Sequence, residues 1–209
     1  MPPLPPEAWT PEMRTMFTIL EGPDAYETGS KSNVFLTLAR HPDLAGSFIK
    51  FNSRLLLKGK IPARLREIVI LRIGWLARSR YEWAQHVRIA LMPDAMSKEQ
   101  IEAFRRGEAA VEGDGLLSRA EVDAVKRGSD HPAWSELERL ALRAVDECRR
   151  DTRVGDETWA GLSRHLSEPE MIELLFVIGV YTLQAIMLNS LGVEPEAAQL
   201  KYADELPAE

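Results

Sequence analysis

The sequence predicts an all-α protein, and three observations support this fold class. Apolar residues recur at helical spacing along most of the chain, and no run alternates convincingly as a strand. Helix-start signals with the spacing of a capping box also recur, at Ser97-x-x-Gln100, Ser118-x-x-Glu121, Ser135-x-x-Glu138 and Ser167-x-x-Glu170. The chain has 209 residues, of which 45% are hydrophobic, enough for one large core or two small cores packed as a unit.

These signals place the helices in order along the chain. Thr10-Pro11 caps the first helix, and Gly192 ends the last one before Glu194-Pro195. The predicted helices cover residues 11–20, 33–39, 42–58, 62–78, 81–91, 98–106, 119–126, 136–150, 157–166 and 168–191.

The boundaries predict one principal unit with two flanking segments. Residues 1–30 form an N-terminal arm and the first helix, residues 31–195 a single helical domain, and residues 196–209 a C-terminal tail. The tract "GEAAVEGDGLLS", followed by "RGSDHPAW", is rich in glycine and charge, which indicates a solvated connection between two helical groups.

The segment "MIELLFVIGVYTLQAIMLNSLGV" is apolar nearly all round, as a central buried helix should be. A membrane span is the alternative, but Glu173 lies near its start, and Gln184 and Asn189 interrupt it before about 20 uninterrupted apolar residues accumulate. We therefore expect a core helix and no membrane association.

Charge and cysteine content narrow the function classes. The net charge is -6 and Lys and Arg are scattered, so no basic footprint for nucleic acid or anionic membrane is present. The N-terminus lacks a basic region followed by an apolar run, so we expect a cytoplasmic protein. The single cysteine, Cys148, follows apolar residues at helical spacing, which favours a core role and excludes an internal disulfide or a dithiol site.

The stretch "LREIVILRIGWLARSRYEWAQHVRIA" carries ionisable residues through the part of the chain expected to be buried. Ser79, Glu82 and His86 are three and four residues apart, so they project along one side of a helix. A tight turn at residues 78–80 would fold the preceding helix, with Glu67, against this side. Two carboxylates and an imidazole would then converge.

Structural alternatives exist for each of these residues. Glu67 falls in the same arc as Arg64, Arg72 and Arg78, so it could be an ion-paired residue on a polar stripe. Glu82 and His86 could be a helix-surface pair. Glu67, Glu82 and His86 also have suitable chemistry for a metal, but their spacing matches no known metal motif, so we expect none.

At these residues the sequence resembles the carboxymuconolactone decarboxylase family, which includes the alkyl hydroperoxide reductase partner AhpD. The characteristic hairpin has Glu, twelve residues later a Cys-x-x-Cys pair, then His four residues beyond the second Cys. Here these positions hold Glu67, Ser79, Glu82 and His86, and "SRYEWAQH" looks like a branch that lacks the Cys pair. The resemblance covers roughly residues 35–195 and implies an AhpD-like fold around a helical hairpin. Two weakly related helical halves are an open possibility.

The resemblance also implies a type of reaction, although this sequence differs from the family at the positions of the reactive cysteines. Thiol peroxidase activity by family membership is disfavoured because both active-site cysteines are absent. The decarboxylase members imply a cofactor-independent lyase or isomerase. His86 would be the general acid/base, Glu67 would orient or relay its proton, and Glu82 would tune the imidazole.

We expect the substrate to be a small lactone-like or ring-bearing metabolite. The candidate substrate-binding residues are Ser79, Tyr81, Trp83, Trp75 and Arg72, the last also as a cation for Glu82. A catalytically inert helical protein retained for binding or assembly is the alternative. Members of the family are usually homo-oligomers, so we expect a dimer or trimer, with apolar Phe48, Phe51, Leu55 and Leu56 in need of a partner.

Overall fold

The computed structural model describes residues 1–92 and 115–206, and within these ranges the regular structure is helical, which confirms the all-α prediction. The longer helices are α1 (Pro11–Glu21), α4 (Pro42–Lys58), α5 (Ala63–Leu76), α6 (Arg80–Ala90), α8 (Arg119–Arg127), α9 (Glu136–Asp151) and α11 (Glu168–Leu191). The shorter ones are α2 (Ala25–Thr28), α3 (Asn33–Leu38), α10 (Asp156–Leu162) and α12 (Leu200–Ala203), with 3-10 turns at Pro6–Ala8 and Ala197–Gln199. The helix predicted over 98–106, with its Ser97 capping box, lies outside the described residues.

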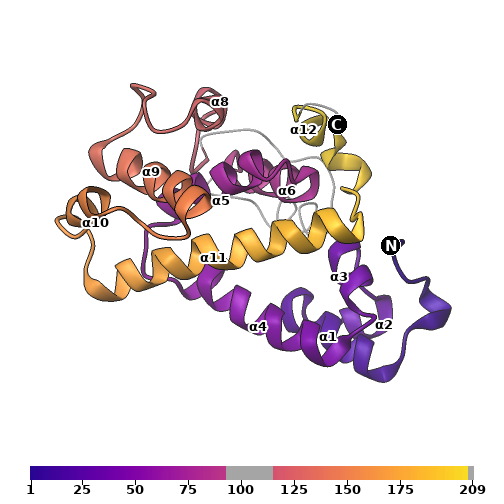
Figure 1. Cartoon of the computed structure of the whole chain (residues 1–209). Helices are drawn as coiled ribbons and strands as arrows, with labels where there is room; N and C mark the ends of the chain where they lie inside the picture. Colours follow the sequence, from indigo (N-terminus) through magenta and orange to yellow (C-terminus); the bar gives the residue numbers. More distant parts are fainter. Residues whose placement is uncertain (93–114, 207–209) are drawn as a thin grey trace.

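The long helix α11 runs across the molecule and organises the fold (Figure 1). It packs against α5, α6 and α4, with α9 and α10 beyond α5 and the N-terminal helices beyond α4. Its 24 residues are long and apolar enough to span a membrane by length and composition alone. In the described fold one face of α11 is buried in the core, as predicted, with Met171, Leu174, Val177 and Tyr181. The other face is exposed at Ile172, Phe176 and Ile186, so the prediction of a helix buried nearly all round is only partly right.

The α5–α6 hairpin carries the residues that the sequence singled out. α5 is buried continuously from Leu65 to Gly74, and its chain reverses at Arg78, whose φ of 51° lies in the left-handed region. The amide of Ser79 donates to the carbonyl oxygen of Gly74 at 2.9 Å. A Cβ on Gly74 would lie 3.3 Å from the backbone nitrogen of Trp83, so glycine allows α6 to approach closely. The predicted tight turn is therefore present.

The C-terminal residues pack more closely than the sequence predicts. α12 lies against α6, and Tyr202, Ala203 and Leu206 are buried in the same core cluster as Trp83. Glu196, just before these residues, accepts hydrogen bonds from the backbone of Asn33 and from side chains on α6. The segment expected as a tail is thus part of the packed structure.

Candidate active site

Glu67 on α5 and His86 on α6 meet inside the protein. Glu67 Oε2 lies 2.7 Å from His86 Nδ1, and the two residues are 0% and 5% exposed. The alternative of a polar surface stripe is wrong for Glu67, because its side chain is fully buried. Arg64 pairs instead with Glu121 and Glu138. Buried charged groups are rarely tolerated without a partner, and the hairpin supplies one for Glu67.

The contact fixes the chemistry of the imidazole. A carboxylate can only accept hydrogen bonds, so we assign the ring proton to Nδ1 of His86, which then donates a hydrogen bond to Glu67. Nε2 of a neutral His86 is then left as the acceptor, the form needed for a general base. Arg66 Nε lies 3.5 Å from the other Glu67 oxygen, an ion pair without hydrogen-bond geometry.

Glu82 is a buried carboxyl group of a different kind. It is 1% exposed, and neither of its oxygens has a hydrogen-bond partner among the described residues. Burial raises the pKa of Glu82 well above its usual range, which favours the protonated, neutral form of the group. The expected helix pair with His86 is not formed, because the imidazole Nδ1 faces Glu67 instead.

A cavity of about 1030 Å³ lies beside the α6 residues. Both His86 and Glu82 line it, together with Tyr81 of α6, Tyr181 of α11 and residues of α4 and the N-terminal segment. Glu67 is not among the lining residues and contacts the cavity only through the imidazole. The site therefore has an imidazole and a carboxylic acid on its wall, with the orienting carboxylate behind.

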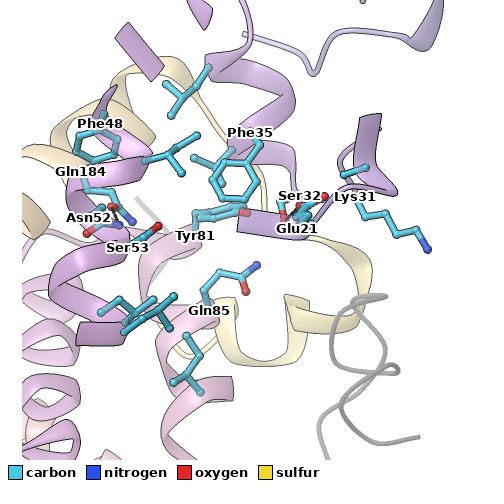
Figure 2. Close-up of a pocket in the computed structure, with 18 of the residues that line it drawn as sticks. Glu21, Lys31, Ser32, Phe35, Phe48, Asn52, Ser53, Tyr81, Gln85 and Gln184 are labelled. Carbon is cyan, nitrogen blue, oxygen red and sulfur yellow. Dashed lines mark hydrogen bonds between the residues drawn. The ribbon is translucent and has the colours of Figure 1, made fainter. Parts of the chain in front are cut away.

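Figure 2 shows how polar groups are distributed around this cavity. Phe48, Asn52 and Gln184 cluster on one side, with the Asn52 amide 3.3 Å from Gln184 Oε1. On the opposite side Glu21 accepts a hydrogen bond from Ser32, close to Lys31 (Figure 2). Tyr181, Asn52 and Glu21 were not predicted from the sequence as residues of the site. The polar residue Gln184 within an apolar helix could have indicated that α11 lines a cavity.

Four of the expected substrate-binding residues do not line this cavity. Arg72 binds Asp146 and the carbonyl oxygen of Val125, at 2.8 and 3.0 Å. Trp83 is 0% exposed and packs against Trp75, with ring centroids 5.3 Å apart. Ser79 is buried at the start of α6.

The expectation of a wall made by these side chains is therefore corrected. Trp75 and Trp83 instead pack in a second core, the cluster that also contains Tyr202 and Leu206. Ser79 lies in the turn before α6. Arg72 forms an ion pair with Asp146 and is not the cation expected beside Glu82. Of the predicted set only Tyr81 lines the cavity, and its hydroxyl already donates to Glu196 at 2.9 Å. Among the described residues, no group of three or more His, Cys, Asp or Glu side chains could hold a metal ion.

Comparisons with known proteins agree with this architecture. Residues 42–126, from α4 through the hairpin to α8, match the profile of the carboxymuconolactone decarboxylase family. The matched segment contains Glu67, Glu82 and His86. No curated protein is similar enough in sequence to be recognised as a relative.

Solved structures show the AhpD-like fold over nearly the whole chain. A peroxidase-related protein from Ralstonia eutropha JMP134, described as an alkylhydroperoxidase AhpD core, is 18% identical with a TM-score of 0.66, covering 99% of this chain and 96% of that chain. The debrominase Bmp8 is 20% identical with a TM-score of 0.67, covering 99% and 97%. A cysteine-to-alanine variant of Bmp8 was solved in complex with 2,3,4-tribromopyrrole. A peroxidase-related protein from Silicibacter sp. TM1040 is 15% identical, with a TM-score of 0.61, covering 94% and 89%.

Proposed function

We propose that this protein is a cofactor-independent lyase or isomerase that moves a proton on a small lactone-like or ring-bearing metabolite. The observation that carries the proposal is the buried 2.7 Å contact between Glu67 and His86, with the imidazole on the wall of a cavity. A His–carboxylate pair at a cavity is the usual apparatus of general acid-base catalysis.

In this reaction His86 is the group that touches the substrate, and Glu67 is a positioning residue. His86 Nε2 takes a proton from the substrate and later returns one. Glu67 holds the ring in the required tautomer and stabilises the imidazolium that forms between the two steps. Since Glu67 lies behind the ring, its effect on the substrate passes entirely through His86.

The cavity supports a small substrate with an apolar ring. Its lining includes the side chains of Phe35, Phe48, Leu56 and Ile89 beside the polar groups of the site. Bmp8, which has the same fold, was solved with a halogenated pyrrole, a small ring compound. Both observations favour a ring-bearing metabolite over an extended polymer.

Thiol-dependent hydroperoxide reduction, the activity suggested by the AhpD-like neighbours, is disfavoured. Such chemistry needs a thiolate nucleophile and a resolving thiol, and the cysteine positions of the family motif hold Ser79 and Glu82 here. A catalytically inert binding protein is the remaining alternative. A cavity beside the buried His86–Glu67 pair favours the enzyme, because an inert protein has no need of such a pair there.

The test is a substrate panel assayed with variants of the relay. His86→Ala should reduce turnover by about 10²–10⁴-fold, the range for loss of general acid-base catalysis. Glu67→Gln should cause an equal or smaller loss, and the double variant should be scarcely worse than the poorer single variant, because the residues act as one unit. The panel consists of lactones, cyclic ketones and small aromatic acids.

A matched control exists on the surface. His165 and Glu136 form a His–Glu contact of 3.5 Å, with the carboxylate side chain 60% exposed. His165→Ala and Glu136→Gln should leave turnover unchanged. The proposal is wrong if His86→Ala keeps wild-type turnover on a panel member that the protein converts, or if no panel member is bound or converted.

A further inference from the structure

Two buried titratable side chains that line the cavity have oxygen atoms without a hydrogen-bond partner of normal geometry among the described residues. Besides Glu82, the hydroxyl of Tyr181 is buried and makes no hydrogen bond of normal geometry with any described residue. Tyr181 belongs to α11 and Glu82 to α6, so separate elements bring them to the same cavity. Unsatisfied buried polar groups cost about 1–3 kcal/mol each, so an oxygen atom of a bound molecule that reached both groups would be stabilised there.

Both donors lie beside the proposed base. The rings of Tyr181 and His86 meet edge to face, with centroids 5.1 Å apart. Glu82 stands one helical turn before His86 on α6, on the same side of that helix. An oxygen atom bound by Glu82 and Tyr181 would therefore place the rest of its molecule next to the imidazole.

Burial also favours the protonated form of both groups. Burial raises the pKa of Glu82 well above its usual range. Burial, followed by the negative charge of Glu67, raises the pKa of the Tyr181 hydroxyl. The Asn52 amide and Arg66 act in the opposite direction on Tyr181, but Asn52 forms no bond of normal geometry with it.

We infer that Glu82, as a neutral carboxylic acid, and Tyr181 together form an oxyanion hole for the carbonyl oxygen of an enolisable lactone or ketone. This inference rests on the proposed function and gives its substrate a chemical class. Donors aimed at developing negative charge are among the largest contributions to catalysis. A tyrosine paired with a protonated acidic residue is a known arrangement for stabilising an enolate.

The resulting reaction is an isomerisation in which atoms and electrons balance. His86 Nε2 takes the proton from the carbon next to the carbonyl group, and the C–H electron pair becomes the C–C double bond of the enolate. The carbonyl π pair moves to oxygen, where Glu82 and Tyr181 donate hydrogen bonds to it. Return of the proton from the imidazolium to a carbon of the enolate restores the carbonyl group, so no oxidant or cofactor is needed.

Binding of 4-nitrophenol tests the oxyanion hole without a substrate. Its ionised form is a coloured oxyanion on a small ring, and its ordinary pKa is close to neutral, so absorbance reports which form is bound. Wild type should bind the phenolate in preference to the phenol. Tyr181→Phe and Glu82→Leu should each weaken phenolate binding about tenfold or more, the loss expected for one hydrogen bond to a charged group.

Further variants separate a neutral donor from other roles. Glu82→Gln should weaken binding less than Glu82→Leu, because the amide N–H still donates. Tyr26→Phe, which removes a hydroxyl that does not line the cavity, is the matched control. Arg88 and Lys31 also line the cavity, but attraction of the phenolate by these cations would be the same in wild type, Tyr181→Phe and Glu82→Leu.

The pH dependence of stability tests the protonation of Glu82 independently. Below the ordinary pKa of 4.5 both folded and unfolded states carry the proton. Above it the unfolded state ionises while the buried group stays neutral, so wild type loses stability with rising pH. Glu82→Gln does not titrate there. The ratio of the wild-type to the Glu82→Gln unfolding constant should therefore rise, by up to tenfold per pH unit, until native Glu82 ionises.

The outcomes distinguish this inference from the proposed function. Preference for the neutral phenol, no binding of either form, or unchanged phenolate binding in Tyr181→Phe would overturn the oxyanion hole. A ratio of the wild-type to the Glu82→Gln unfolding constant that does not change with pH would also overturn it. This second measurement does not use Glu82→Leu, so it decides the question even if that variant does not fold. The proposed function fails separately, if His86→Ala retains turnover.

Discussion

Glu67 and Glu82 are two buried carboxyl groups on adjacent helices, and their different surroundings give them different chemistry. Glu67 has the imidazole of His86 at 2.7 Å and Arg66 at 3.5 Å, so the structure compensates its negative charge. Glu82 has no such partner among the described residues, and burial raises its pKa, which favours the protonated form. Acidic groups whose environments differ in this way commonly divide acid and base roles.

The cysteine gives a prediction at the same scale. Cys148 on α9 packs against the core cluster that contains Leu162 and Val145, and it does not line the cavity. Burial, and then the charge of Glu147, raises the pKa of the thiol, which lowers its thiolate fraction. Cys148→Ser should therefore leave substrate turnover unchanged, and wild type should not consume organic hydroperoxides with a dithiol reductant. Peroxide consumption by wild type that disappears in Cys148→Ser would contradict the packing role.

The sequence could locate the reactive residues but not the walls of the cavity. Helical spacing and the predicted turn were sufficient to bring Glu67, Glu82 and His86 to one hairpin. Since α5 and much of α6 are buried on several sides, periodicity could not tell which aromatic residue faces the cavity and which faces the second core. Tyr181 and Asn52 come from α11 and α4, so only the tertiary packing of those helices reveals them.

At the scale of elements, local capping chemistry accounts for the success of the predicted boundaries. The capping boxes at Ser118, Ser135 and Ser167 are all formed, and each begins a helix within a residue of its predicted start. The short helices α2 and α12 were not predicted. Each has four residues, so neither offers a full apolar period to detect, and both depend on contacts with larger helices.

The turn between α4 and α5 is held by a carboxylate from α11. Glu173 accepts the backbone N–H groups of Lys60, at 2.7 Å, and Ile61, at 3.0 Å, which have no helical partner before α5 begins. Glu173→Ala should destabilise the protein by about 1.5–3 kcal/mol, the range for hydrogen bonds to a charged group.

Thermal or urea unfolding measures this effect, which corresponds to roughly 2–4 °C per kcal/mol for a chain of this size. Glu157→Ala is the control, because Glu157 is 92% exposed and makes only a surface contact with Arg143. Its effect should stay within about 0.5 kcal/mol. Equal melting temperatures for Glu173→Ala and wild type would show that the turn does not need this carboxylate.

At the scale of the whole molecule, α11 presents one buried and one exposed apolar face. The exposed residues form a stripe along the helix, made of Ile172, Leu175, Phe176, Gly179, Leu183 and Ile186. Phe51 of α4 extends it by an edge-to-face contact with Phe176, with ring centroids 5.7 Å apart. Of the four α4 residues expected to need a partner, only Phe51 is exposed, whereas Leu55 is buried in the core.

The stripe is nearly symmetric about Gly179. Ile172 and Ile186 lie seven residues to either side of the glycine, and Leu175 and Leu183 lie four residues to either side. A Cβ on Gly179 would meet no atom within 4 Å, so a second helix could approach closely there. Such a pattern matches itself when two copies of α11 pack antiparallel around a two-fold axis, which is the commonest symmetry of soluble oligomers. We therefore propose a homodimer built on this face, within the expected range of dimer or trimer.

Gly179→Arg tests this dimer at its centre. The two-fold axis would bring the two arginines together, so charge repulsion and bulk should convert the dimer to a monomer, as measured by light scattering at micromolar concentration. Glycine is about 1 kcal/mol less favourable than alanine within a helix, and arginine is a good helix former, so α11 itself should not be weakened. Ala160→Arg, on the exposed part of α10, adds the same charge away from the stripe and should leave the dimer intact. A monomeric wild type would show that there is no dimer. A dimer that persists in Gly179→Arg would show that the two copies meet at another surface.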